Sequence, residues 1–177
     1  MEFWETSARD LAPLDTVNIG IGGTKIGDHL AYIDEMVVPF APKALVVYAG
    51  SNDINAIPFM SKSGERVAAL VLEYIQAVHR RLPGLPIHYV AITEAPVRAR
   101  VRAEIQRANS LIKAAADQHD DVHFVDTAPA LLTDAGLIDD ALFRRDGLHL
   151  NDRGYAVFAS VVRGHLASFY TDPADRT

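Results

Sequence analysis

The order of apolar and polar positions along the chain alternates short apolar runs with longer amphipathic segments. Four runs are rich in Val, Ile, Tyr and Phe and are bounded by glycine, proline or polar turn residues, which is typical of strands. They are TVNIGI (16–21), ALVVYAG (44–50), PIHYVAIT (86–93) and VHFVDT (122–127). Their nearly continuous apolar character indicates strands that are covered on both faces, as in a parallel sheet.

Three longer segments repeat their apolar residues with the period of an α-helix. They cover 65–82, 98–117 and 152–169, and either Asn151 or Asp152 can cap the last one. Alternating strands and helices predict an α/β fold with helices on both faces of one sheet. In such sheets, ligands bind where the strands end at their carboxyl side, so motifs in those loops carry the most weight.

Composition limits the class of protein further. At 177 residues the chain is long enough for one domain with a single core, spanning residues 1–177. The net charge of −6 argues against a nucleic-acid partner, and the absence of cysteine excludes disulfides, a thiolate nucleophile and sulfur-ligated metals. No apolar stretch reaches the roughly 18 residues of a membrane span, and no signal peptide is visible. As written, the chain is expected to be cytoplasmic, without membrane insertion.

Two loops that follow predicted strands carry polar groups. In NIGIGGT (18–24) the glycines do not complete a dinucleotide fingerprint, because the third glycine position is Lys25. They either permit a tight turn or allow Gly23 to offer its backbone N–H to an anion. In YAGSNDI (48–54) the Asn52 amide can donate to an oxyanion, with Asp53 beside it. The alternative for these two residues is turn formation and helix capping.

The third motif lies in RRDGLHLNDRGY (144–155). Asp146 can hydrogen-bond one ring nitrogen of His149, which fixes the tautomer and leaves the other nitrogen free as a base. The alternative is a loop acid and a surface histidine before a helix. A metal site is a weaker interpretation, because two ligands are too few and the other histidines show no ligand spacing with them: His88, His119 and His123.

Taken together, NIGIGG, GSND and DGLHLN resemble the ordered sequence blocks of the SGNH hydrolases, also called GDSL esterases and lipases, from about residue 16 to 165. The resemblance implies a flavodoxin-like three-layer α/β/α fold and hydrolysis of small-molecule carboxylic esters by a serine, without metal or cofactor. It makes His149 the general base, Asp146 its orienting acid, and Gly23 and Asn52 the donors of the oxyanion hole. We expect short acyl or acetyl esters rather than long-chain lipids.

The nucleophile of that family is not found in the sequence. Its serine belongs to a Gly-Asp-Ser or Gly-Ser-Ser motif, whereas MEFWETSARDLAPL (1–14) resembles the segment that follows such a motif. We therefore expect the serine just upstream of Met1, on a missing central strand between 16–21 and 44–50, in an N-terminally truncated chain. Ser7, Ser51 and Thr24 are poorer candidates. A truncation would also hide a signal peptide, so secretion is not excluded.

Two further hypotheses follow from the same residues. The chain is a non-catalytic member of the family that binds acyl or sugar groups, or an unrelated flavodoxin-like binding domain in which the motifs form turns. The segments 55–64 and 94–101 are expected to line the pocket. The missing strand raises the chance of a homo-oligomer or of strand exchange between chains.

Overall fold

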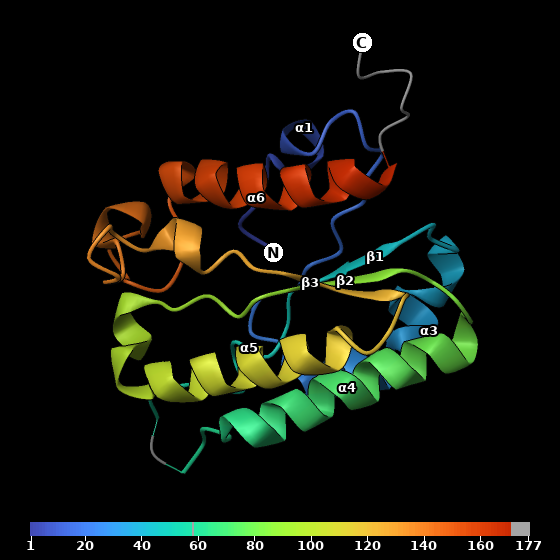
Figure 1. Cartoon of the computed structure of the whole chain (residues 1–177), viewed down its shortest axis with the longest axis horizontal. Helices are drawn as coiled ribbons and strands as arrows, with labels where there is room; N and C mark the ends of the chain where they lie inside the picture. The colour runs from blue at the N-terminus through green and yellow to red at the C-terminus, as the bar shows by residue number, and fades with distance from the viewer. Residues whose placement is uncertain (58, 171–177) are drawn as a thin grey trace.

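The computed structural model describes residues 1–57 and 59–170. Its central element is a parallel sheet of three strands in the order β1 (Leu45–Val47), β2 (Ile87–Val90) and β3 (Val122–Val125) (Figure 1). These strands confirm three of the four predicted ones, each at a shorter length. Because the strands are parallel, their carboxyl ends lie along the same edge of the sheet, and the loops that follow them gather there.

Helices cover both faces of the sheet, so the predicted α/β/α layering is confirmed (Figure 1). On one face lie α4 (Gly64–Arg81) and α5 (Arg102–Ala116); on the other lie α6 (Asp152–Tyr170) and the short α1 (Ser7–Asp10). The three predicted helices match α4, α5 and α6. The remaining elements are short: α2 (Ile26–Ala31), α3 (Ile33–Met36), and the 3₁₀ helices η1 (Val38–Phe40), η2 (Pro96–Val101), η3 (Pro129–Leu131) and η4 (Asp140–Leu142).

The sheet separates two apolar cores, because successive side chains of a strand point to opposite faces. On β2, Ile87 and Tyr89 pack into the core beneath α4 and α5. Val90 packs into the second core, with Trp4 from the N-terminal segment and Phe158 of α6. The N-terminal segment is thus anchored on the α6 side of the sheet.

The predicted strand at 16–21 is wrong, since this segment is irregular. Val17 and Ile21 are 69% and 54% exposed, so the apolar run is not covered by a helix layer. The Asn18 side chain donates to Met1 O at 3.1 Å and to Ser7 Oγ at 3.3 Å, which ties the segment to the N-terminal residues instead of to a strand. An apolar run becomes a strand only where a neighbouring strand accepts its backbone hydrogen bonds. Within the described residues, β1 pairs on its β2 side only.

A close backbone contact sets where α6 begins. Asn151 Oδ1 accepts from Gly154 N at 3.0 Å, so Asn151 is the capping residue of the two predicted. Its Nδ2 donates to Ala141 O at 2.8 Å and Phe143 O at 3.0 Å. A Cβ on Gly154 would lie 2.2 Å from Leu142 O, so only glycine permits this approach. The loop between η4 and α6, which carries Asp146 and His149, is therefore held at both ends.

Candidate active site

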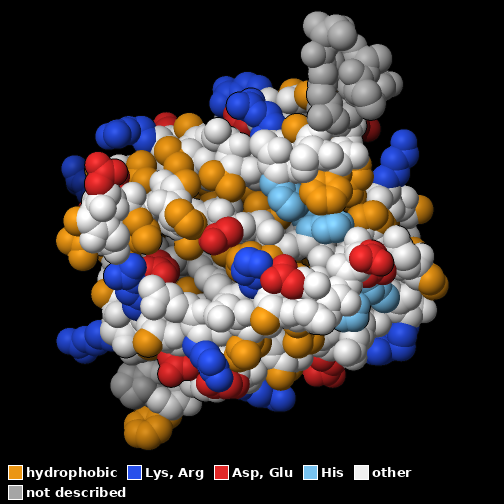
Figure 2. Space-filling model, viewed as in Figure 1, with side chains coloured by type: hydrophobic (Ala, Val, Ile, Leu, Met, Phe, Trp, Pro, Cys, Tyr) orange, Lys and Arg blue, Asp and Glu red, His pale blue; other side chains and the backbone are white. Residues whose placement is uncertain are grey.

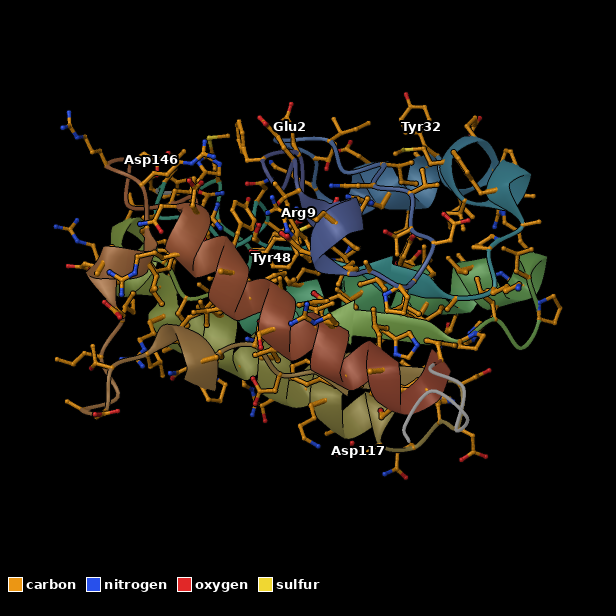
Figure 3. The ribbon with its side chains drawn as sticks, turned by 90° about the horizontal axis from the view of Figure 1, so that it is seen from above. Glu2, Arg9, Tyr32, Tyr48, Asp117 and Asp146 are labelled. Atoms are coloured by element: carbon orange, nitrogen blue, oxygen red, sulfur yellow. The ribbon has the colours of Figure 1, made fainter. Side chains whose placement is uncertain are left out.

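A pocket of about 120 Å³ lies at the carboxyl ends of the strands. Its walls come from the N-terminal residues 1–3, the glycine loop, the loop after β1, the loop after β2 and the loop before α6. Gly23, Asn52 and His149 all line it, and Asp146 is bonded to His149. In Figure 3, Asp146 lies on the loop that leads into α6, and Glu2 lies on the neighbouring N-terminal segment. The structure therefore brings the four predicted site residues together from loops far apart in the sequence.

The Asp146 carboxylate holds His149 in one orientation. His149 Nδ1 lies 2.7 Å from Asp146 Oδ2, while Asp146 Oδ1 accepts from Leu148 N at 2.8 Å and His149 N at 3.0 Å. These hydrogen bonds hold the pKa of Asp146 well below its ordinary value, and the one from the imidazole has the largest effect. An ionised acceptor requires a proton on Nδ1, so Nε2 is the basic nitrogen. The ring is 38% exposed, so substrate can reach it.

The N-terminal segment packs directly on this histidine. The Phe3 ring meets the His149 ring edge to face, with centroids 4.7 Å apart, and the Arg144 guanidinium carbon lies 5.1 Å from the Phe3 ring centroid. This ring contact adds to the hydrogen bonds of Asp146 in restricting the imidazole. Nothing in the sequence pattern singles out Phe3, because contacts between the first residues and a loop near the other end of the chain have no local signature.

The Asn52 amide connects two walls of the pocket. Its Nδ2 donates to Thr24 O in the glycine loop at 3.0 Å, and its Oδ1 accepts from Arg98 Nη2 on η2 at 3.2 Å. Arg98 belongs to the segment 94–101, which is predicted to line the pocket and does so through Ala95 and Arg98. The segment 55–64 supplies none of the pocket residues among those described.

The glycine loop includes the backbone N–H of Gly23, the predicted oxyanion donor. Gly23 has φ of +77°, a conformation that favours glycine, and a Cβ there would meet nothing within 4 Å. No hydrogen bond among the described residues uses the Gly23 N–H as donor. The loop is fixed from below by the fully buried Asp53, which accepts from Ile26 N at 2.9 Å and from Lys62 Nζ at 2.6 Å. Helix capping, one of the two interpretations of Asn-Asp, thus applies to Asp53.

None of the hydroxyl groups of the described residues is hydrogen-bonded to His149. Ser51 lines the pocket, Ser7 Oγ accepts from Asn18, and Thr24 Oγ1 donates to Ile21 O at 2.8 Å. The described residues contain no group of three His, Asp or Glu side chains arranged to hold an ion.

Comparison with known proteins decides the family. The model of the GDSL-like lipase/acylhydrolase family matches residues 2–157. The chain belongs to this family. Platelet-activating factor acetylhydrolase IB subunit alpha1 of Pongo abelii is 28% identical over 147 residues, which cover 82% of this chain and 61% of that protein. The chain thus spans less than two thirds of the length of this relative.

Solved structures of the same fold agree. A protein of Streptococcus pneumonia named after platelet activating factor superposes with a TM-score of 0.78 at 24% identity, covering 93% of this chain and 78% of that one. An acetyl xylan esterase superposes with a TM-score of 0.73 at 19% identity, covering 90% of this chain and 88% of that one. These superpositions show that the chain shares their fold. No helix in the described part of the chain is long and apolar enough to cross a membrane.

Proposed function

We propose that this protein hydrolyses short-chain carboxylic esters, acetyl esters above all, with His149 as general base. The observation that carries the proposal is the 2.7 Å bond between Asp146 and His149 in a pocket that also contains the Asn52 amide and the unused Gly23 N–H. A base held in one tautomer in a pocket that also offers two hydrogen-bond donors is the arrangement that acyl transfer requires.

Each group has one task in the proposed reaction. A serine oxygen attacks the ester carbonyl as His149 Nε2 takes its proton, and the C=O electron pair moves onto the carbonyl oxygen. The Gly23 N–H and an Asn52 amide N–H donate to that oxyanion. His149 returns the proton to the departing alcohol, which leaves an acyl-enzyme. Water then attacks under the same base, and the acid and the free serine are released.

The nucleophile is proposed to be a serine N-terminal to Met1, on a strand that pairs with the second edge of β1. Two observations support this placement. Met1 lines the same pocket as His149, so a short extension from it stays within reach of the imidazole. Within the described residues the β1 edge opposite β2 has no paired strand, and Val46 on β1 is 41% exposed.

The size of the pocket supports a small acyl group. Sites for larger ligands typically enclose about 300–1,000 Å³, whereas this one has about 120 Å³ and is lined by Tyr48 and Phe158 among others. The names of the curated relative and of the acetyl xylan esterase both specify acetyl groups.

Hydrolysis of p-nitrophenyl acetate tests the proposal. Residues 1–177 and the same chain with its natural upstream segment are assayed, each with His149→Ala and with His119→Ala as a matched control on an exposed histidine. We expect turnover from the extended chain, a loss of at least about 10³-fold in His149→Ala, and no loss in His119→Ala. Residues 1–177 alone should be nearly inactive.

Two other outcomes would redirect the assignment. Full turnover by residues 1–177 that disappears in Ser51→Ala would place the nucleophile on the loop after β1. Binding of an acetyl ester without turnover by either chain would favour the non-catalytic acyl- or sugar-binding domain.

A further inference from the structure

A buried arginine lies in the wall of the pocket without an acidic partner. Arg98 is 7% exposed, lines the pocket from η2, and takes part in none of the ion pairs formed by the described residues. Buried charges are normally paired, since desolvation of an isolated charge is costly. Its neighbour Arg102 on α5, by contrast, is bonded to the Glu94 carboxylate. The hydrogen bond of Arg98 goes to Asn52 instead.

This hydrogen bond fixes which way the Asn52 amide points. With Oδ1 toward Arg98 and Nδ2 toward Thr24 O, each end of the amide meets a complementary partner. In the flipped orientation the NH₂ would face a guanidinium N–H and the oxygen would face a carbonyl, so both contacts would be repulsive. The two partners therefore select the same orientation, in which Nδ2 lies at the glycine-loop side of the pocket. One of its two hydrogens is used on Thr24.

The charge of Arg98 acts in the same direction. Burial lowers the pKa of Arg98, but a guanidinium remains protonated throughout the neutral range. A cation against Oδ1 draws electron density from the amide and strengthens its N–H groups as donors.

We propose that Arg98 is a positioning residue that holds the Asn52 amide in its oxyanion-donating orientation. This inference rests on the proposed ester hydrolysis. Arg98 acts through Asn52 and does not itself contact the reacting atoms.

The first test measures the amide itself and needs no activity. In ¹⁵N-labelled protein, the Asn52 side-chain NH₂ signals are assigned by their loss in Asn52→Ala. We expect Arg98→Gln to shift or broaden these signals, whereas Arg100→Gln, on an exposed arginine of the same η2 helix, leaves them unchanged. Arg98→Lys keeps a cation at the site. It serves as a control in case Arg98→Gln unfolds because the charge is removed. We expect it to change the signals less than Arg98→Gln does.

The second test is a kinetic double-mutant cycle with p-nitrophenyl acetate as substrate. It uses the chain with its natural upstream segment, from which turnover is expected. Removing one oxyanion donor typically costs about 10²–10³-fold in kcat, so we expect Arg98→Gln to lower kcat about 10-fold or more with KM changed less than about 3-fold. In an Asn52→Ala background the same substitution should have no further effect on kcat, because its route of action is gone. Arg98→Lys should recover part of kcat.

The outcomes separate this inference from the proposed function. Unchanged Asn52 signals in Arg98→Gln, or an undiminished kcat effect of Arg98→Gln in the Asn52→Ala background, would overturn the positioning role. If no chain hydrolyses the ester, the proposed function fails, and the role of Arg98 in positioning Asn52 for catalysis fails with it, even where the amide signals change.

Discussion

Two histidines of this protein sit in opposite environments. His149 lies at the carboxyl ends of the strands, 38% exposed, with its Nδ1 on a carboxylate. His88 on β2 is fully buried, with Nδ1 3.0 Å from His165 Nε2 and Nε2 2.6 Å from the Tyr170 hydroxyl. Figure 2 shows histidine side chains gathered with hydrophobic ones beneath the C-terminal part of α6.

The difference lies in what surrounds each ring. His88 stacks on His123 at 4.9 Å and meets Phe169 at 5.0 Å, and its burial lowers its pKa to about 3. A ring that stays neutral and inaccessible cannot accept a substrate proton at ordinary pH. His149 has an anion beside it and an open face. Location and partner therefore distinguish the proposed base from a packing residue, where residue type alone does not.

The largest expected effect comes from removing the anion that distinguishes His149. Asp146→Asn keeps the shape of the side chain but frees the imidazole to take the other tautomer, in which Nε2 carries the proton. We expect kcat for acetyl ester hydrolysis to fall about 10³- to 10⁴-fold, with KM little changed. Steady-state kinetics measures this. An Asp146→Asn enzyme with kcat within a few-fold of the unaltered protein would show that the pair does not supply the base.

At His88 we expect a substitution to lower stability and to leave kcat unchanged. His88→Ala deletes a fully buried ring and two hydrogen bonds, which should lower the free energy of unfolding by about 3 kcal/mol. The fraction that remains folded should keep its kcat. Urea denaturation followed by circular dichroism, together with an activity assay of the folded protein, separates the two. A fall in kcat without a loss of stability would contradict the assignment of His88 as a packing residue.

The smallest effect is a pH dependence of stability. The pKa of His88 is lowered in the folded protein, and that of His165 is lowered too, so the unfolded chain binds their protons first as pH falls. The contribution of these two histidines to the free energy of unfolding is fully present above about pH 6.5. Below that pH it declines, by at most about 1.4 kcal/mol per pH unit for each histidine. Asp146 also loses its contribution on acidification, but only below the ordinary carboxyl range near about pH 4.

Urea unfolding curves collected from pH 7.5 to 5 test this slope. We expect His88→Gln to flatten it and His119→Gln, on an exposed histidine, to leave it as it is. An identical slope in His88→Gln would mean that the buried cluster is not the source.

The sequence predicts those parts of the molecule that have a local pattern. The apolar runs of β1, β2 and β3 and the periodic faces of α4, α5 and α6 give the layered fold correctly. The run at 16–21 has the same composition but is irregular, because strand formation depends on a partner that local composition does not reveal. The spacing of Asp146 and His149 predicts their contact, since both belong to one loop.

Contacts between segments that are far apart in the sequence cannot be predicted from local patterns. Phe3 on His149 and Arg98 on Asn52 join residues that are 146 and 46 positions apart. Arginine in a loop after a strand is ordinarily a solvated surface residue, so composition gives no reason to expect its burial. Only the three-dimensional arrangement of η2 beside the loop after β1 brings Arg98 to the amide.

Covalent labelling tests most directly whether His149 activates a serine in this pocket. A fluorophosphonate probe, which reacts with activated serines, is incubated with the full natural protein and with its His149→Ala and His119→Ala variants, and the labelled peptide is identified by mass spectrometry. We expect one labelled serine in the unaltered protein and in His119→Ala, and none in His149→Ala. No labelled serine in the unaltered protein, or a label that survives in His149→Ala, would contradict it.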